Sequence, residues 1–93
     1  MENTYVRYFL SNTKWKDDVA AEYSLNVYPI IPRVGEYIDL PEEIFVNNYS
    51  YDDYCEFDYC EVVEVQHFPH CGCDGIGLID IYIEGGFDDE GDE

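Results

Sequence analysis

Positive charge is nearly absent from this sequence of 93 residues. Lysine and arginine total four, against 22 aspartates and glutamates, and the formal net charge at pH 7 is −18. Direct binding to nucleic acid or to an anionic membrane requires lysine or arginine to neutralise phosphates, so we expect neither. Three explanations of the acidity remain open: a basic protein partner, a bound metal ion and a purely solubilising role.

Long apolar runs are also missing. No segment approaches the ~20 apolar residues that a membrane-spanning helix needs. Met1 is followed by Glu2 and not by a secretory leader. We therefore expect a cytoplasmic protein, in which the four cysteines are reduced thiols.

Hydrophobic residues, in contrast, are plentiful. They make up 46% of the chain, and aromatic residues make up 17%. Disordered chains are poor in both, so this one is expected to fold, and its length suits a single domain. We predict one β-rich domain over residues 1–86 and a disordered acidic tail over 87–93, where five of seven residues are acids.

Alternation of apolar and polar residues predicts that the domain is built from strands. The expected strands are residues 4–10, 23–31, 37–40, 55–67 and 77–84, with a short one over 44–46. A helical turn over 19–23 is the weaker alternative at the start of the second strand. In the last strand, the inward side chains are expected to be Ile79, Ile81 and Ile83, and the outward ones Leu78, Asp80 and Tyr82.

Three local features interrupt these strands. Gly35 permits a tight bend that a residue with a Cβ would resist. The alternation slips after Val62, which predicts a β-bulge near Val63 and Glu64. Residues 47–53, rich in asparagine, tyrosine and aspartate, are expected to form a polar loop.

Part of this pattern resembles a known group of proteins. Pro-Arg-Val-Gly-Glu at residues 32–36 leads into Tyr-Ile-Asp-Leu, and a Cys-x-Val-x-x-Val-x-His strand at 60–67 precedes a closing hydrophobic strand. Over residues 30–84 the chain resembles small SH3-like barrel proteins encoded as single-domain genes in phages and mobile elements. The resemblance implies an all-β fold, a five-stranded, half-open SH3-like barrel, and brings no catalytic residues with it.

Acids and tyrosines are interleaved most densely at residues 51–59. Carboxylates spaced like DNA phosphates, among aromatic rings that bury area at low entropic cost, can occupy a basic groove evolved for nucleic acid. By analogy with small acidic anti-CRISPR and anti-restriction proteins, we expect an inhibitor of a basic defence enzyme, such as a nuclease. The expected contact residues are Asp52, Asp53, Tyr54, Glu56, Asp58, Tyr59, Tyr37, Asp39, Asp80 and Tyr82.

Two other binding functions stay open. A structural or assembly adaptor would bind its partner through exposed aromatic residues such as Trp15, Tyr37 and Tyr82. A zinc module would need four thiolate or imidazole ligands. They would come from His70, Cys71 and Cys73 together with either Cys55 or Cys60. The spacing of those last two cysteines is poor for zinc, so no metal and no cofactor are predicted.

Catalytic patterns are weak. The two histidines, His67 and His70, are not placed beside a convincing nucleophile, and the only close thiol, Cys71, is an immediate neighbour in sequence. Gly75-Ile76-Gly77 lacks the third glycine and the following helix of a phosphate-binding loop. We predict a binding protein and no enzyme.

Overall fold

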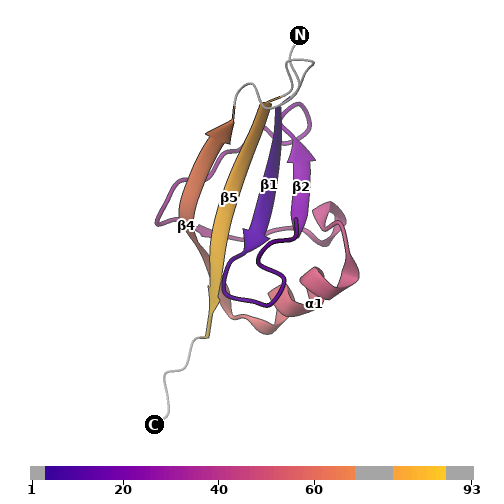
Figure 1. The fold of residues 1–93 in the computed structure, drawn as a ribbon, viewed down its shortest axis with the longest axis vertical. Helices are drawn as coiled ribbons and strands as arrows, with labels where there is room; N and C mark the ends of the chain where they lie inside the picture. The colour runs from indigo at the N-terminus through magenta and orange to yellow at the C-terminus, as the bar shows by residue number, and fades with distance from the viewer. Residues whose placement is uncertain (1–3, 69–76, 88–93) are drawn as a thin grey trace.

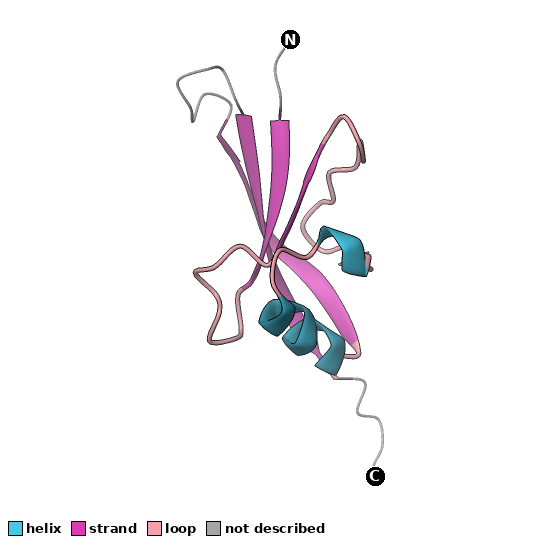
Figure 2. Cartoon of the chain, turned by 90° about the vertical axis from the view of Figure 1, so that its right-hand side faces the viewer, coloured by secondary structure: helices cyan, strands magenta, loops and turns pink. Residues whose placement is uncertain are grey.

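The computed structural model describes residues 4–68 and 77–87. Its strands are β1 (Thr4–Leu10), β2 (Ala21–Ser24), β3 (Tyr37–Ile38), β4 (Tyr59–Phe68) and β5 (Gly77–Gly86). A short 3-10 turn, η1 (Glu42–Ile44), and a helix, α1 (Asn48–Glu56), lie between β3 and β4. The strands form one mixed sheet in the order β2-β1-β5-β4-β3, which curls into a half-barrel with α1 at one end (Figures 1 and 2).

The two central strands, β1 and β5, run parallel to each other, with Val6 opposite Ile79 and Leu10 opposite Ile83. Alternate side chains of both strands point into the curl, where Ile81 and Ile83 have no exposed surface. The predicted inward set of isoleucines is therefore confirmed. Each fully buried aliphatic side chain of this kind contributes roughly 1.5–3 kcal/mol to folding.

The third core strand, β4, contains the predicted irregularity. Its register against β5 shifts between Val62 and Glu64, so the β-bulge near Val63 is confirmed. The bulge lets Val62 pair with Ile83 and Val65 pair with Ile81, so that both valines share the inner face. Cys60 and Val62 are both buried there.

Residues 48–56 form a helix, so the prediction of a polar loop over 47–53 and of a strand starting at Cys55 is wrong. The side chain of Asn47 caps the helix by accepting a hydrogen bond from the Ser50 N–H at 2.8 Å. The buried side of the helix is formed by Ser50 and Tyr54, four residues apart, and Phe57 follows three residues later. Packing thus overrides weak helix propensity, and the fold is mostly β with one helix instead of all-β.

The second predicted strand is also shorter than expected, because it ends at Ser24 instead of continuing to residue 31. The Ser24 hydroxyl accepts a hydrogen bond from the Asn26 N–H, and its carbonyl accepts from Val27 and Tyr28. These bonds close a turn that apolar alternation does not reveal. The predicted short strand over 44–46 is reduced to one bridge between Ala21 and Phe45.

The bend before β3 matches its prediction. Gly35 has a φ of 94°, in the left-handed region that favours glycine. Its N–H donates to the carbonyl of Val62, and the N–H of Val62 donates to the carbonyl of Glu36. The bend is thereby tied to β4, and the predicted alternation follows it, with Tyr37 exposed and Leu40 buried.

Two glycines at the end of β5 fix the position of the helix. Gly85 and Gly86 belong to the strand, which extends two residues beyond its predicted end. A Cβ on Gly85 would overlap the ring of Phe57, and one on Gly86 would overlap the ring of Tyr59. The bare glycine backbone therefore makes room for the ring of Phe57, just after α1, and for the ring of Tyr59, the first residue of β4.

The outer face of the sheet carries an ion pair between its central strands. Arg7 and Asp80 are opposite each other, and two hydrogen bonds of 2.8 and 2.9 Å join the guanidinium to the carboxylate. Beside them, the rings of Phe9 and Tyr82 stack at 5.1 Å. Asp80 does point away from the isoleucines, as expected, but it is 5% exposed because Arg7 covers it.

Some predictions concern residues outside the described ranges. These are most of the acidic tail, at residues 88–93, and the turn over 69–75, which includes His70, Cys71 and Cys73. Phe87 is described, and its ring lies 5.5 Å from that of Phe57. Among the described residues, no helix is long and apolar enough to cross a membrane.

Loss of the Arg7–Asp80 ion pair should destabilise the protein. In Asp80→Asn, the arginine loses a two-bond carboxylate partner in a partly buried setting, and we expect unfolding in urea to require about 1–3 kcal/mol less. Glu84→Gln is the matched control, because it makes the same chemical change at an exposed carboxylate of the same strand. An equal loss in both variants would contradict the structural role of the ion pair.

Candidate functional site

Eight of the ten predicted contact residues lie in or directly beside α1, β3 and the start of β4, and four of them line one groove between these elements. Asp80 and Tyr82 lie elsewhere, on the outer face of the sheet, in the ion pair and the ring stack described above. We call the eight residues the acidic patch. They are Tyr37, Asp39, Asp52, Asp53, Tyr54, Glu56, Asp58 and Tyr59.

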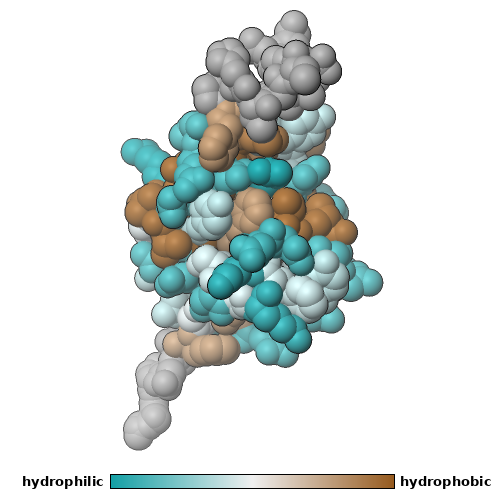
Figure 3. Space-filling view, viewed as in Figure 1, coloured by the Kyte–Doolittle hydropathy of each residue, from teal (hydrophilic) through white to brown (hydrophobic). Residues whose placement is uncertain are grey.

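The helix presents three of these acids together. At about 100° per residue, Asp52 and Glu56 lie on the outward side of the helix, and Asp53 lies next to Glu56 at the edge of the buried side. Asp52 and Glu56 are exposed, and Asp53 is half-buried. Within the described residues, none of the three forms an ion pair. On the face shown in Figure 3, hydrophilic and near-neutral side chains cover the region where α1 and the loop after β1 lie.

This arrangement is unfavourable for the helix itself. Asp52 and Glu56 are four residues apart, a spacing at which like charges destabilise a helix by roughly 0.2–0.5 kcal/mol. The acids also lie towards the C-terminal end, where the helix dipole favours cations, and the last turn contains no basic residue. A cationic partner would relieve both effects.

A groove of about 380 Å³ runs between the end of the helix and strands β3 and β4. Four residues of the acidic patch line it, namely Asp39, Tyr54, Asp58 and Tyr59. The Tyr54 hydroxyl accepts a hydrogen bond from the Leu40 N–H at 2.8 Å and lies 3.4 Å from an Asp39 carboxylate oxygen. These contacts anchor the helix beside β3, at the edge of the groove.

Aromatic rings stiffen the same end of the molecule. The rings of Tyr37 and Tyr59, on neighbouring strands, lie 5.4 Å apart. Trp15, in the loop after β1, packs on Tyr49 at 4.1 Å and is half-buried, so it joins that loop to the helix. Trp15, which an adaptor would use as an exposed residue, is therefore partly buried by this packing.

The two described cysteines occupy contrasting environments. Cys60 is buried in the core as a small hydrophobic residue, and burial raises the pKa of its thiol to about 11. Cys55 is exposed on α1, where its hydrogen bond with Tyr51 raises the pKa of the tyrosine to about 12. In the described part of the chain, no three histidine, cysteine or acidic side chains are grouped so as to hold a metal ion.

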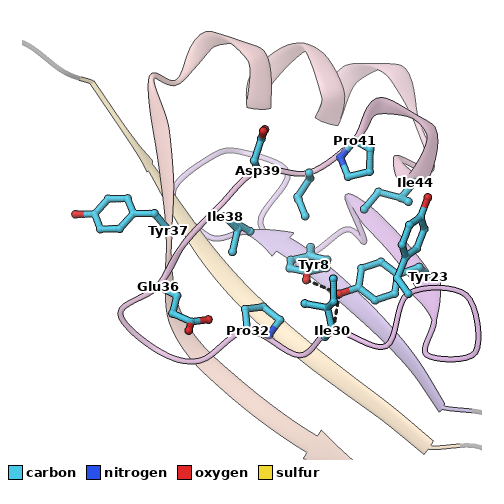
Figure 4. Close-up of a pocket in the computed structure, with 12 residues that line it drawn as sticks. Tyr8, Tyr23, Ile30, Pro32, Glu36, Tyr37, Ile38, Asp39, Pro41 and Ile44 are labelled. Atoms are coloured by element: carbon cyan, nitrogen blue, oxygen red, sulfur yellow. Dashed lines mark hydrogen bonds between the residues drawn. The ribbon is translucent and has the colours of Figure 1, made fainter.

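A second cavity, also of about 380 Å³, was not predicted from the sequence. It opens in the mouth of the half-barrel between the sheet and residues 28–41 (Figure 4). At its floor, the hydroxyls of Tyr8 and Tyr23 lie 2.8 Å apart, and Tyr23 donates to the carbonyl of Ile30 at 2.7 Å. We call this cavity the barrel pocket.

The signal that could have revealed the barrel pocket is a run of apolar residues in a segment that forms no strand. Val27, Ile30, Ile31 and Val34 all remain substantially exposed. The strand predicted over residues 23–31 covers part of this run, but the turn at Ser24 ends the strand, and the chain that follows crosses the mouth of the barrel.

Comparison with protein-family models, with curated proteins and with solved structures gives no match for this chain. The site is therefore interpreted from its own residues and geometry.

The tyrosine pair predicts a loss of stability at alkaline pH. Burial raises the pKa of Tyr8 well above 10, and the hydrogen bond to Tyr23 raises it further. Burial also raises the pKa of Tyr23. Because these pKa values are higher in the folded protein than in the unfolded chain, their stabilisation is complete below pH ~10 and is lost as the pH rises above it.

Tyr8→Phe should remove one of these contributions. We expect the free energy of unfolding at pH 7 to fall by about 0.5–1.5 kcal/mol, since one hydrogen bond is lost. Between pH 10 and 11, the variant should lose less stability than the unmodified protein. Urea unfolding at several pH values measures both effects, with Tyr37→Phe as an exposed control. A parallel decline in all three proteins would refute this assignment.

The cysteines should differ in reactivity towards iodoacetamide at pH 8. Thiolate is the reactive form, so exposed Cys55 should be alkylated in the folded protein, whereas Cys60 should react only after unfolding in urea. Peptide mapping by mass spectrometry distinguishes the two sites. Equal rates in the folded protein would mean that Cys60 is not held in the core.

Proposed function

We propose that this protein is an inhibitor that binds a basic protein surface through its acidic patch and blocks the groove with which that partner holds nucleic acid. The observation that carries the proposal is the face of α1 formed by Asp52, Asp53 and Glu56. These acids form no ion pair among the described residues and stand where they disfavour the helix. The analogy with acidic anti-CRISPR and anti-restriction proteins gives the partner class, a nucleic-acid-binding defence nuclease.

The net charge of −18 supports this proposal through the kinetics of association. A strongly acidic surface steers a basic partner into contact and raises the association rate at low salt. The effect fades as the Debye length falls from ~10 Å at 0.1 M salt to ~3 Å at 1 M. Binding should therefore be tight and sensitive to salt, and it should require no catalysis by this chain.

The half-barrel can be assigned to a more specific type of fold. We propose that the half-barrel is of the SH3-like type, as the resemblance over residues 30–84 implies. The bend at Gly35, which is hydrogen-bonded to Val62, supports this resemblance because it lies in the Pro-Arg-Val-Gly-Glu segment. The same resemblance to phage and mobile-element proteins supports a cytoplasmic location, where a defence nuclease would be met.

An adaptor function is the second candidate, and one observation favours it. Apolar side chains are exposed around the barrel pocket, including Val27, Ile30 and Val34 at 60–66% exposure. Exposed apolar clusters often mark protein-binding surfaces. Binding by an adaptor would depend on these residues and would change little with salt.

Neutralising the helix acids should abolish inhibition without unfolding the protein. The variant combines Asp52→Asn, Asp53→Asn and Glu56→Gln, and we expect it to be as stable as the unmodified protein or slightly more stable. The measurement is inhibition of DNA cleavage by a panel of purified DNA-binding defence nucleases at 0.1 M salt. Against a nuclease that the unmodified chain inhibits, the variant should lose at least about tenfold in potency, since several charge contacts are removed.

The matched control removes the same charge from the outer face of the sheet. Glu22→Gln, Glu64→Gln and Glu84→Gln change three exposed strand carboxylates and leave α1 unaltered. This control should inhibit almost as well as the unmodified protein. Equal losses in the two variants would show that total charge matters and the patch does not. Failure of the unmodified chain to inhibit any nuclease in the panel would count against the partner class.

A further inference from the structure

The barrel pocket and the groove of the acidic patch are adjacent. Ile38 and Asp39 line both cavities, with one cavity on each side of this short segment. A partner bound to the acidic patch can therefore also reach the mouth of the barrel pocket. The barrel pocket and the acidic patch therefore belong to one continuous surface, the surface through which the proposed inhibitor binds its partner.

The walls of the barrel pocket are mainly apolar. Ile30, Pro32, Ile38, Leu40 and Ile44 line it (Figure 4). Its volume of about 380 Å³ lies within the range of roughly 300–1,000 Å³ that is typical of ligand pockets. A bulky aliphatic or aromatic side chain entering the pocket would leave water and contact several of these residues.

The loop beside the pocket remains apolar although the fold does not bury it. Ile30 is 60% exposed and Val34 is 62% exposed, in a segment that belongs to no strand. In a protein with so much surface charge, exposed apolar side chains next to an apolar pocket indicate a surface that a partner covers.

The rim of the pocket carries negative charge. Glu36 and Asp39 are exposed lining residues on either side of β3, and no lysine or arginine is among the described residues that line the pocket. A third carboxylate, that of Glu43, accepts a hydrogen bond from Tyr28, which also lines the pocket. An apolar group that enters here is therefore favoured when it is flanked by cations.

Hydrogen bonding at the floor agrees with this charge. The single proton of the Tyr23 hydroxyl is donated to the Ile30 carbonyl, so the Tyr8 hydroxyl must donate to Tyr23. The Tyr8 oxygen accepts no hydrogen bond within this chain of hydrogen bonds, so its lone pairs can still accept one. Both floor and rim favour hydrogen-bond donors and cations over anions.

We propose that the barrel pocket receives one bulky apolar side chain from a lysine- or arginine-rich segment of the protein partner, whose flanking cations lie against Glu36 and Asp39. This inference rests on the proposed function for the basic character of the partner. It adds an apolar anchor to a surface otherwise recognised by charge, and such anchors commonly supply most of the affinity of an interface.

Three synthetic nonapeptides test the inference on the full chain by NMR of its methyl groups. The first has a central leucine flanked on each side by four lysines. The second replaces the leucine with alanine at equal charge, and the third keeps the leucine between serines. The first peptide should shift the methyl signals of Ile38 and Leu40. It should also bind at least about tenfold more tightly than the second, because leucine buries more apolar surface than alanine. The third should bind far more weakly.

A pair of matched variants connects the result to the pocket. Ile30→Lys places a cation on the pocket wall, and Val34→Lys makes the same change in charge at an equally exposed residue that does not line the pocket. The preference for leucine over alanine should disappear in Ile30→Lys and persist in Val34→Lys. Far-ultraviolet circular dichroism should show that both variants are folded.

Other outcomes would overturn the inference. Equal affinity for the leucine and alanine peptides, with no change in the signals of Ile38 and Leu40, would show that the pocket is not an anchor site and would leave the acidic-patch proposal intact. Equal binding of the serine-flanked peptide would assign the pocket to a neutral apolar ligand. Failure of the proposed function is detected separately, in the cleavage assay with the α1 variants, since those substitutions lie outside the pocket.

Discussion

The parallel pairing of β1 with β5 joins the two ends of the chain, and the other elements are arranged around it. Inside the curl, Val6 and Leu10 meet the isoleucines of β5, and outside it Arg7 binds Asp80 across the same two strands. The strands β2 and β4 add to the two edges of this pair. At the end of β5, the ring of Phe57 packs against Gly85, where no side chain is in the way. This contact helps to set the position of α1 and its acids.

The fold keeps its charges apart from its core, and this separation gives the surface its character. With a net charge of −18, repulsion among carboxylates opposes folding, and the apolar interior must offset it. On α1 the acids also destabilise the helix that carries them, and no ion pair among the described residues compensates for this. A basic partner would convert that repulsion into attraction, and the apolar pocket beside the patch would give such a partner a fixed point of attachment.

The sequence predicted best what depends on local alternation. The strands at residues 4–10 and 77–84, the inward isoleucines, the bulge near Val63 and the bend at Gly35 all follow from periodicity and backbone freedom. The helix α1 was not predicted because the helix propensity of its residues is weak. Its N-cap and its packing against the core decide that this segment is helical. Asp80 could not be recognised as buried, since its partner Arg7 is 73 residues away in sequence. The barrel pocket was not predicted because it forms only where residues 28–41 cross the mouth of the half-barrel.

The central claim is that the acidic patch competes with nucleic acid for a basic groove. The most direct test immobilises the full chain, loads it with a nuclease that it inhibits, and adds duplex DNA at increasing concentration in 0.1 M salt. We expect DNA to release the nuclease at concentrations near the dissociation constant of the nuclease–DNA complex, and 1 M salt to release it without DNA. Retention of the nuclease under both conditions, or formation of a ternary complex with DNA, would contradict mimicry of nucleic acid.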